Sequence, residues 1–200
     1  MIDIRYFLAR QNAARNGISG PPSQPAASPQ APVRNTKISR AGERVVLDLV
    51  GPEIEPLTTV EEDSYCVMKG NIPPGVSVPL HSHADSESFY VISGEVQLLV
   101  EENGNSDWRT VRQGDFVQIP GNAKHAWRNL SDRPMEALIT TTPRLGKALR
   151  EMGVTGNGHE RPLPTREDIE RLAQITARYG YWMASPDENA AVGISLVAAA

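Results

Sequence analysis

The stretch HSHADSESFYVISG, residues 81–94, places two histidines one residue apart, a glutamate four residues later, and then an alternating run closed by glycine. The histidines end an apolar run, residues 76–83, that is typical of a strand. Side chains two residues apart in a strand share a face, so His81 and His83 point the same way. Glu87 follows after a brief turn and keeps the inward parity of the next strand. Two imidazoles and a carboxylate in this arrangement predict a site for a divalent metal ion.

A further ligand has to come from another strand, and two histidines remain, His125 and His159. His125 follows a strand and a proline-bounded turn and opens the run HAWRN, where a strand enters the sheet. His159 lies in the polar loop GNGHERP. We therefore expect His125 to join the site and His159 to stay outside it as a solvated side chain. Asp85 competes with Glu87 as the acidic ligand.

Short β-like runs separated by turn residues fill the chain from about residue 36 to residue 142, which favours a sandwich or barrel over alternating strands and helices. Asn103 and Gly104 separate two of these runs, and Asn-Gly is a strong signal for a tight hairpin because both residues tolerate positive φ. We expect the two flanking strands to pair antiparallel. The runs cover residues 43–51, 64–70, 76–83, 88–94, 95–102, 108–114, 115–120, 125–131 and 135–143.

These residues resemble the two motifs of the cupin superfamily. The first, G-x5-H-x-H-x3-E-x6-G, is matched by Gly75, His81, His83, Glu87 and Gly94. The second, G-x5-P-x-G-x2-H-x3-N, is matched by Gly114, Pro120, His125 and Asn129. The second motif has one departure, because Asn122 stands where the family has glycine and Gly121 comes one position early. Asparagine is the residue that best replaces glycine at positive φ, so we expect the turn to survive.

The resemblance implies a mainly β fold, a double-stranded β-helix or jelly-roll barrel, over about residues 40–142. It implies that His81, His83, Glu87 and His125 are the metal ligands, and it favours Glu87 over Asp85. It also implies a homodimer that pairs through the barrel sheets. Iron, manganese, nickel, cobalt or zinc would suit the ligand set. The region after residue 143 is loosely similar to the tails of small single-domain bacterial cupins related to quercetin 2,3-dioxygenase.

Inward-facing side chains near the ion are expected to line a pocket for a small molecule. Three imidazoles and one carboxylate would leave two positions of an octahedral ion open, for a substrate oxygen and for O2 or water. A largely apolar wall suits an aromatic or enolic molecule. The expected pocket residues are Met68, Phe89, Val91, Leu98, Trp127 and Asn129.

These features lead us to expect a metal-dependent dioxygenase for a small enolic or phenolic substrate, with Glu87 as the group that accepts the substrate's proton. One alternative is a cupin that binds a small ligand without turnover, as a sensor or carrier. Another is a metal-dependent isomerase or lyase. A lysine or tyrosine base near the ion would favour the latter, and the motif region offers only Tyr90, Lys69 and Lys124, at outward positions or on a loop.

Three segments are expected on composition. Residues 1–35 form a flexible or partner-wrapping arm rich in proline, serine and alanine, residues 36–142 form the β-barrel, and residues 143–200 form a helical extension. The extension contains a short helix near residues 144–153 and a clearer one within residues 164–180. In the clearer helix Thr165 can cap the start, and the apolar stripe consists of Ile169, Leu172, Ala173 and Thr176. The last twenty residues show no interpretable pattern.

Charge and cysteine content exclude several partner classes. The net charge is −4 with acidic and basic residues mixed along most of the chain, so no footprint for nucleic acid or an anionic membrane is present. No stretch approaches the length of a membrane span. The single cysteine, Cys66, cannot form an internal disulfide and is expected to be a buried packing residue. A reducing compartment fits best, and we expect a cytoplasmic protein.

Overall fold

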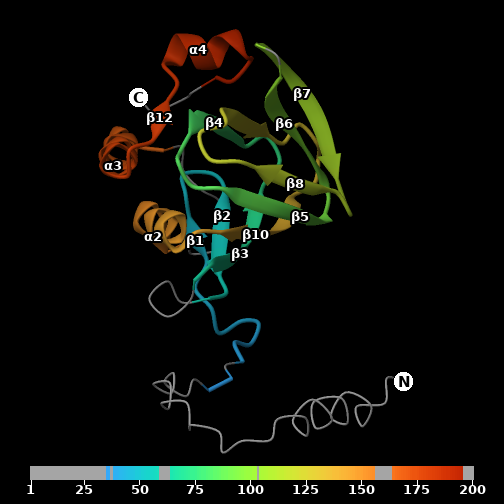
Figure 1. Cartoon of the computed structure of the whole chain (residues 1–200), viewed down its shortest axis with the longest axis vertical. Coiled ribbons are helices and arrows are strands. Elements are labelled where there is room, and N and C mark those ends of the chain that lie inside the picture. Colours follow the sequence, from blue (N-terminus) through green and yellow to red (C-terminus); the bar gives the residue numbers. More distant parts are fainter. Residues whose placement is uncertain (1–34, 37, 59–63, 103, 156–163, 196–200) are drawn as a thin grey trace, which may run out of the picture. The chain divides into compact units, whose positions relative to one another are not determined.

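The computed structural model describes residues 35–36, 38–58, 64–102, 104–155 and 164–195 (Figure 1). The chain divides into two units, Met1–Ile38 and Ser39–Ala200. The second unit carries every feature described below. The expected arm falls almost entirely outside the described residues, and so does His159.

Two antiparallel sheets form the body of the second unit (Figure 1). The larger sheet has the order β11 (Val154–Thr155), β1 (Leu47–Asp48), β2 (Glu53–Pro56), β3 (Cys66–Ile72), β10 (Met135–Thr141), β5 (Glu87–Ser93) and β8 (Phe116–Ile119). The smaller sheet has the order β12 (Trp182–Met183), β4 (Ser77–Ser82), β9 (His125–Arg128), β6 (Glu95–Glu102) and β7 (Asn105–Arg112). This architecture confirms the mainly β jelly-roll fold, built as two packed sheets and not as one closed barrel.

The hairpin expected around Gly104 is present, because β6 and β7 pair antiparallel and Glu102 lies opposite Asn105.

The first expected strand is much shorter than its apolar run. The Asp48 carboxylate accepts a hydrogen bond from the Val50 backbone N–H at 2.7 Å, and Val50 has a φ of 66°, so the chain turns there. Strands β2, β11 and β12 were not expected. Strands β11 and β12 are two-residue edge strands whose partners, β1 and β4, lie far away in the sequence, whereas β2 pairs with its sequence neighbours β1 and β3.

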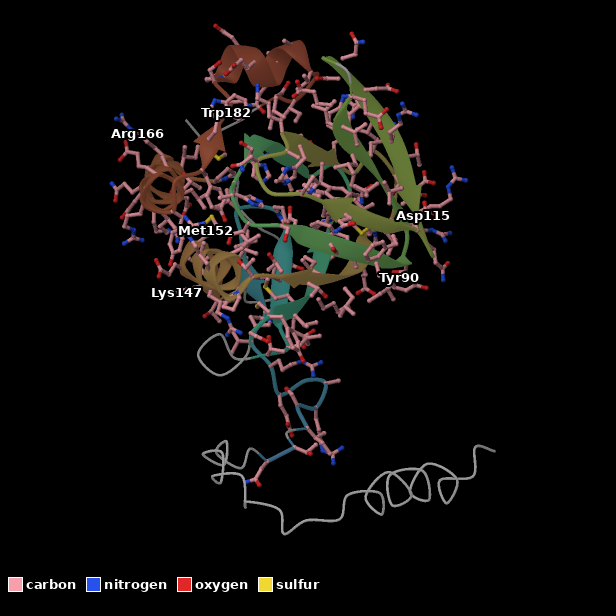
Figure 2. All side chains as sticks on the ribbon, in the orientation of Figure 1. Tyr90, Asp115, Lys147, Met152, Arg166 and Trp182 are labelled. Carbon is pink, nitrogen blue, oxygen red and sulfur yellow. The ribbon has the colours of Figure 1, made fainter. Side chains whose placement is uncertain are left out.

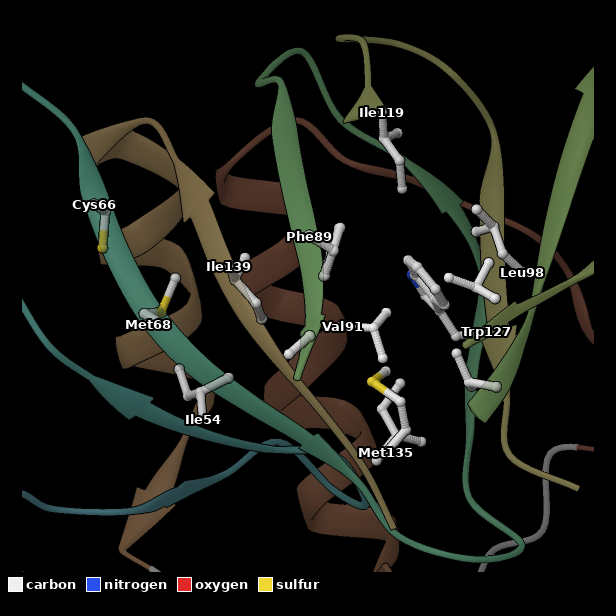
Figure 3. Close-up of a cluster of buried hydrophobic side chains, with 14 residues drawn as sticks. Ile54, Cys66, Met68, Phe89, Val91, Leu98, Ile119, Trp127, Met135 and Ile139 are labelled. Atoms are coloured by element: carbon white, nitrogen blue, oxygen red, sulfur yellow. The ribbon is translucent and has the colours of Figure 1, made fainter. Parts of the chain in front are cut away.

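The main core lies between the two sheets (Figure 3). Alternate residues of β3 and β10 are buried, as period-two strands with one inward face require. Phe89 of β5 and Trp127 of β9 meet across the core with ring centroids 4.8 Å apart. Gly70 is fixed by this packing, since a Cβ there would lie 2.6 Å from Ile139 Cδ1. Cys66 is a free, buried cysteine, as expected of a packing residue.

Three described helices follow the strands of the motif region: α2 (Pro143–Met152), α3 (Arg166–Arg178) and α4 (Pro186–Ala191). Helix α3 begins at the expected cap, because Thr165 and Asp168 form a capping box. Figure 2 shows Met152 between α2 and α3, whereas Lys147 and Arg166 point outward. No helix in the described part of the chain is long and apolar enough to span a membrane.

The apolar stripe expected on α3 holds only in part, at Leu172 and Thr176. Ile169 and Ala173 are exposed, and the buried side chains are Ile175 and Thr176. The reason is that α3 packs through its C-terminal half, where Ile175 joins Ala148 and Met152 of α2 in a separate apolar cluster. The N-terminal half of α3 extends into solvent.

The segment after α3 returns to the smaller sheet, although its sequence showed no pattern. Strand β12 pairs with β4, with Trp182 opposite Ser82 and Met183 opposite His81. Asn189 of α4 is fully buried, and its side-chain oxygen accepts a hydrogen bond from the Leu80 backbone N–H at 2.9 Å. The Asn189 amide nitrogen donates to the carbonyls of Ala184 and Ser185. These contacts fix the segment on the outer side of β4.

Candidate metal centre

Three histidines meet at the end of the smaller sheet. His81 near the end of β4 lies opposite His125 at the start of β9, and His83 follows directly after β4. The candidate ligand atoms of the three imidazoles all lie within 4.8 Å of one another. His83 and His125 are buried and His81 is partly buried. A cluster of this kind can hold a metal ion.

Backbone carbonyls fix the orientation of all three imidazoles. His81 Nδ1 lies 2.7 Å from the Pro79 carbonyl oxygen, His83 Nδ1 lies 2.8 Å from that of Asp85, and His125 Nδ1 lies 2.9 Å from that of Ala123. A carbonyl oxygen only accepts hydrogen bonds, so each Nδ1 carries the proton and each Nε2 keeps a free lone pair. Histidines that bind metals are oriented in this way.

Glu87 at the start of β5 brings a carboxylate to the same place. Its Oε1 lies 3.0 Å from His125 Nε2 and 3.5 Å from His83 Nε2. His125 Nε2 is buried and has no hydrogen-bond partner of acceptable geometry among the described residues. A cation at this point would satisfy that nitrogen and the carboxylate together, so the residues present fit a divalent metal ion.

The protonation states of His81 and Glu87 also fit. Burial, together with the neighbouring His125, lowers the pKa of His81 to about 3. Burial raises the pKa of Glu87, but the His125 and His83 side chains outweigh this effect and lower the pKa to about 2. Burial opposes a charge on His83, yet the Glu87 carboxylate beside it raises the pKa of His83. A neutral His81 and an ionised Glu87 are the forms that bind a metal ion.

Asp85, the other candidate acid, is engaged elsewhere. Its carboxylate accepts a hydrogen bond from Thr142 Oγ1 at 2.5 Å and forms an ion pair with Arg144. Both partners lie at the start of α2. Asp85 therefore connects the loop between β4 and β5 to the helical extension, and Glu87 supplies the carboxylate that faces the imidazoles.

The turn before His125 keeps its shape despite the departure from the motif. Asn122 has a φ of 67°, the conformation that glycine would take in its place. The Asn122 backbone N–H donates to the His83 carbonyl oxygen at 2.6 Å. Gly121 is needed for close approach, because a Cβ there would lie 2.2 Å from the Ala84 carbonyl oxygen. The two motifs are thus in direct contact.

A cavity of about 190 Å³ opens beside His81, Glu87 and His125. Phe89 and Trp127, two of the expected pocket residues, contribute to its wall. Much of the remaining wall is apolar and includes Ile54, Ile72, Val78, Met135, Ala137 and Ile139.

Four expected pocket residues do not line the cavity. Met68, Val91 and Leu98 face inward but are covered on all sides, so they fill the core between the sheets. Asn129 is fully buried, and its amide donates to the carbonyl oxygens of Ile72 and Arg133. Asn129 holds the loop after β9 and does not face the cavity. Whether a strand residue points inward therefore does not tell which inward residues line the cavity and which fill the core.

The helical extension contributes to the cavity, although every pocket residue expected from the sequence lies in the β region. The Tyr181 ring centroid lies 5.0 Å from that of His83, and its hydroxyl is buried without a hydrogen-bond partner among the described residues. Burial raises the pKa of Tyr181. The available signal was the aromatic run RYGYWM directly after the predicted helix. Wall residues from the extension include Leu149, Met152, Leu172, Thr176, Tyr181 and Met183.

Comparison with known proteins finds similarity over the region that contains this site. Residues 68–141 match the family model described as a cupin domain. Dimethylsulfoniopropionate lyase DddQ from Ruegeria pomeroyi is 32% identical over 77 residues, which is 38% of this chain and 36% of the relative. The chain therefore matches about a third of the length of this curated relative.

Two solved structures with a similar arrangement of strands are matched over somewhat more of the chain. A variant of oxalate decarboxylase from Bacillus subtilis is 24% identical, with a TM-score of 0.47, and the match covers 56% of this chain and 30% of that one. An RmlC-like cupin from Shewanella frigidimarina is 18% identical, with a TM-score of 0.46, and the match covers 55% and 92%.

Proposed function

Since residues 68–141 of this chain form a cupin domain, we propose that the protein is a metal-dependent enzyme for a small, oxygen-containing substrate. His81, His83 and His125 bind the ion, and Glu87 is the fourth ligand. One observation carries this proposal. Three imidazoles locked by backbone carbonyls share one point with an ionised carboxylate, and His125 Nε2 has no other partner among the described residues. A bound iron, manganese, nickel, cobalt or zinc ion would polarise an oxygen atom of the substrate.

The size of the cavity favours a compact substrate. Its volume is about 190 Å³. Pockets for drug-sized ligands span roughly 300–1,000 Å³. A small carboxylic acid or carbonyl compound matches this space better than a flavonol does. Phe89 and Trp127 supply an apolar wall for the carbon skeleton of such a molecule.

Among the possible reactions, we favour proton abstraction followed by elimination, the chemistry of a lyase. Glu87 is ionised and buried beside the cavity, so its carboxylate can accept a proton from the carbon next to a carbonyl or carboxylate group. The electrons of that C–H bond form a double bond, and the leaving group departs with the electrons of its own bond. The reaction balances without an oxidant. The local identity to a dimethylsulfoniopropionate lyase supports the same class.

The dioxygenase expected from the sequence is the second candidate. Its support is the apolar, aromatic part of the cavity wall, which suits a small enolic or phenolic compound such as a β-diketone or catechol. Binding of such a ligand without turnover, as in a sensor or carrier, is the third.

Turnover assays with defined metals distinguish the three. The purified protein is loaded with Fe(II), Mn(II), Co(II), Ni(II) or Zn(II) and incubated without oxygen with dimethylsulfoniopropionate and other small acids that carry a leaving group on the β-carbon. A lyase forms the unsaturated acid anaerobically, and Zn(II) supports the reaction because no redox step occurs. Oxygen uptake with β-diketones or catechols, restricted to redox-active metals, would instead establish the dioxygenase. Calorimetric binding without either product would establish the carrier.

The outer face of the larger sheet carries an exposed apolar row. Phe116, Tyr90 and Leu138 form one cross-strand row on the outer face of the larger sheet, with exposed fractions of 66%, 50% and 36%. Figure 2 shows Tyr90 on the side of the unit away from α2 and α3, so these helices do not cover the row. We propose that this row pairs with the same row of a partner in a homodimer, as a two-fold interface requires.

A further inference from the structure

Tyr181 is held in a defined position between α3 and β12. Its backbone N–H donates to the Thr176 carbonyl oxygen at 2.9 Å. Two residues later, Met183 pairs with His81. The backbone on both sides of Tyr181 is therefore fixed, and these contacts set the position of its Cα relative to the candidate metal centre.

The Tyr181 ring packs against the candidate ligands. It is nearly parallel to the His81 ring, with an interplanar angle of 12° and centroids 6.4 Å apart, and it also contacts the His83 ring. The ring lines the cavity. A phenylalanine would supply the same ring contacts, so packing does not account for the hydroxyl.

The hydroxyl of Tyr181 is the unexplained group. Its oxygen is buried and has no hydrogen-bond partner among the described residues. A buried polar group without a partner costs free energy, so one retained beside a cavity calls for an explanation. The neighbouring imidazoles offer no acceptor to it, because each Nδ1 already donates to a carbonyl and each Nε2 faces the candidate ion position. A ligand in the cavity is the remaining partner.

We propose that the Tyr181 hydroxyl donates a hydrogen bond to an oxygen atom of the ligand at the metal centre and so selects small carboxylates and carbonyl compounds. This inference rests on the proposed metal centre and deepens it. It adds a ligand-contacting residue from outside residues 68–141, the part of the chain that matches the family model. The helical extension then sets the ligand preference of a site whose metal ligands all come from the β domain.

The test compares wild type, Tyr181→Phe and Tyr179→Phe. Tyr179 is the matched control, because its hydroxyl donates to Glu151 Oε1 at 2.8 Å and does not line the cavity. Each protein is loaded with Co(II), its metal content is measured, and its visible spectrum is titrated with acetate and with imidazole. Acetate offers an oxygen acceptor, whereas imidazole binds through nitrogen and offers none.

We expect all three proteins to hold the same amount of Co(II). Tyr181→Phe should bind acetate about tenfold more weakly than wild type, since a hydrogen bond to a charged group is lost. Its affinity for imidazole should stay within about twofold, and Tyr179→Phe should match wild type with both probes. Unchanged acetate affinity in Tyr181→Phe would overturn the proposal. Equal weakening for both probes would also overturn it, because the change would then be a general distortion.

Thermal melting of the metal-free and ligand-free proteins gives a second readout. Removing a hydroxyl that has no partner should leave the Tm of Tyr181→Phe equal to or above that of wild type. A clearly lower Tm, or loss of Co(II) from this variant alone, would show a structural role for the hydroxyl and contradict the proposal. If wild type itself binds no Co(II), the proposed metal centre fails, and that outcome is distinct from a failure confined to Tyr181.

Discussion

The three candidate histidines share one local geometry although they come from two strands and a loop. In each, Nδ1 faces the carbonyl oxygen two residues earlier or later in the chain. The backbone therefore sets the tautomer, and no additional side chain is needed for it. This explains why spacing in the sequence was informative for His81, His83 and His125. Tyr181 had no such signal, because its position depends on pairing between β12 and β4, which lie far apart in the chain.

Removing one imidazole should remove the metal. We expect the metal content of His81→Ala and of His125→Ala to fall from roughly one bound ion per chain to almost none. The reason is that the three ligands that remain bind the ion much more weakly than the full set of four. Far-ultraviolet circular dichroism should stay native, since apolar strands hold the fold. His159→Ala, a change outside the described residues, should keep full metal in elemental analysis. Full metal in the two ligand variants would sink the ligand assignment.

Glu87 should matter more for turnover than for binding. Glu87→Gln keeps the shape of the side chain but removes its charge and its proton-accepting oxygen. Expressed per bound metal ion, we expect kcat to fall by about 10² to 10⁴, with a much smaller change in KM. Steady-state kinetics on the substrate identified in the anaerobic assay checks this. Asp85→Asn is the comparison, since its carboxylate pairs with Arg144 and not with the imidazoles, and an equal loss of kcat there would argue against Glu87 as the proton acceptor.

The elements outside the motif region show which local signals suffice. Helix α3 was predictable from its capping box and its length. Helix α4 carries a similar signal, Ser185 followed by Pro186 and Glu188, but six residues are too few for an apolar period to show. Strand β12 has two residues, and only its hydrogen bonds to β4 define it. Tertiary contacts determine where short elements of this kind form, and a local sequence pattern does not predict these contacts.

Asn189 should contribute most to holding the segment that contains β12 and α4 against β4. Asn189→Ala leaves the buried Leu80 N–H without its acceptor and removes two further hydrogen bonds. We expect a loss of about 2–3 kcal/mol in the free energy of unfolding, together with faster hydrogen exchange at Trp182 and Met183. Denaturant unfolding and exchange mass spectrometry measure both. Asp187→Asn, an exposed change on the same helix, should leave both unchanged, and a similar effect of the two variants would refute this role.

At the scale of the whole molecule, the mainly β class followed from short β-like runs separated by turn residues, and the β6–β7 hairpin followed from the Asn103-Gly104 turn signal. The division between core and cavity did not, because Met68 and Phe89 share inward parity yet only Phe89 lines the cavity. The helical extension closes part of that cavity, and its place on the sheets depends on contacts such as the Asp85–Arg144 ion pair. Side-chain periodicity carries no information on such docking.

The proposed homodimer gives a prediction at this scale. Phe116→Glu places a charge in the exposed row and should shift the protein from dimer to monomer in multi-angle light scattering, because desolvating an unpaired carboxylate in an apolar interface is costly. Ile169→Glu is the control, since Ile169 is an exposed apolar residue on α3 and lies outside the row. The control should remain dimeric. A monomeric wild type, or a Phe116→Glu variant that stays dimeric, would rule out this face.

Strand β4 is bonded along one edge to β9, which carries His125, and along the other to β12, which follows Tyr181. When the strand on one edge of β4 is ordered, less conformational entropy remains to be lost in ordering the strand on its other edge. Metal binding at the proposed centre and docking of β12 and α4 would therefore be thermodynamically linked, and by reciprocity each would strengthen the other by the same factor. Loss of metal from the proposed centre would then also loosen β12 and α4, so metal supply would help to determine how long the protein survives proteolysis.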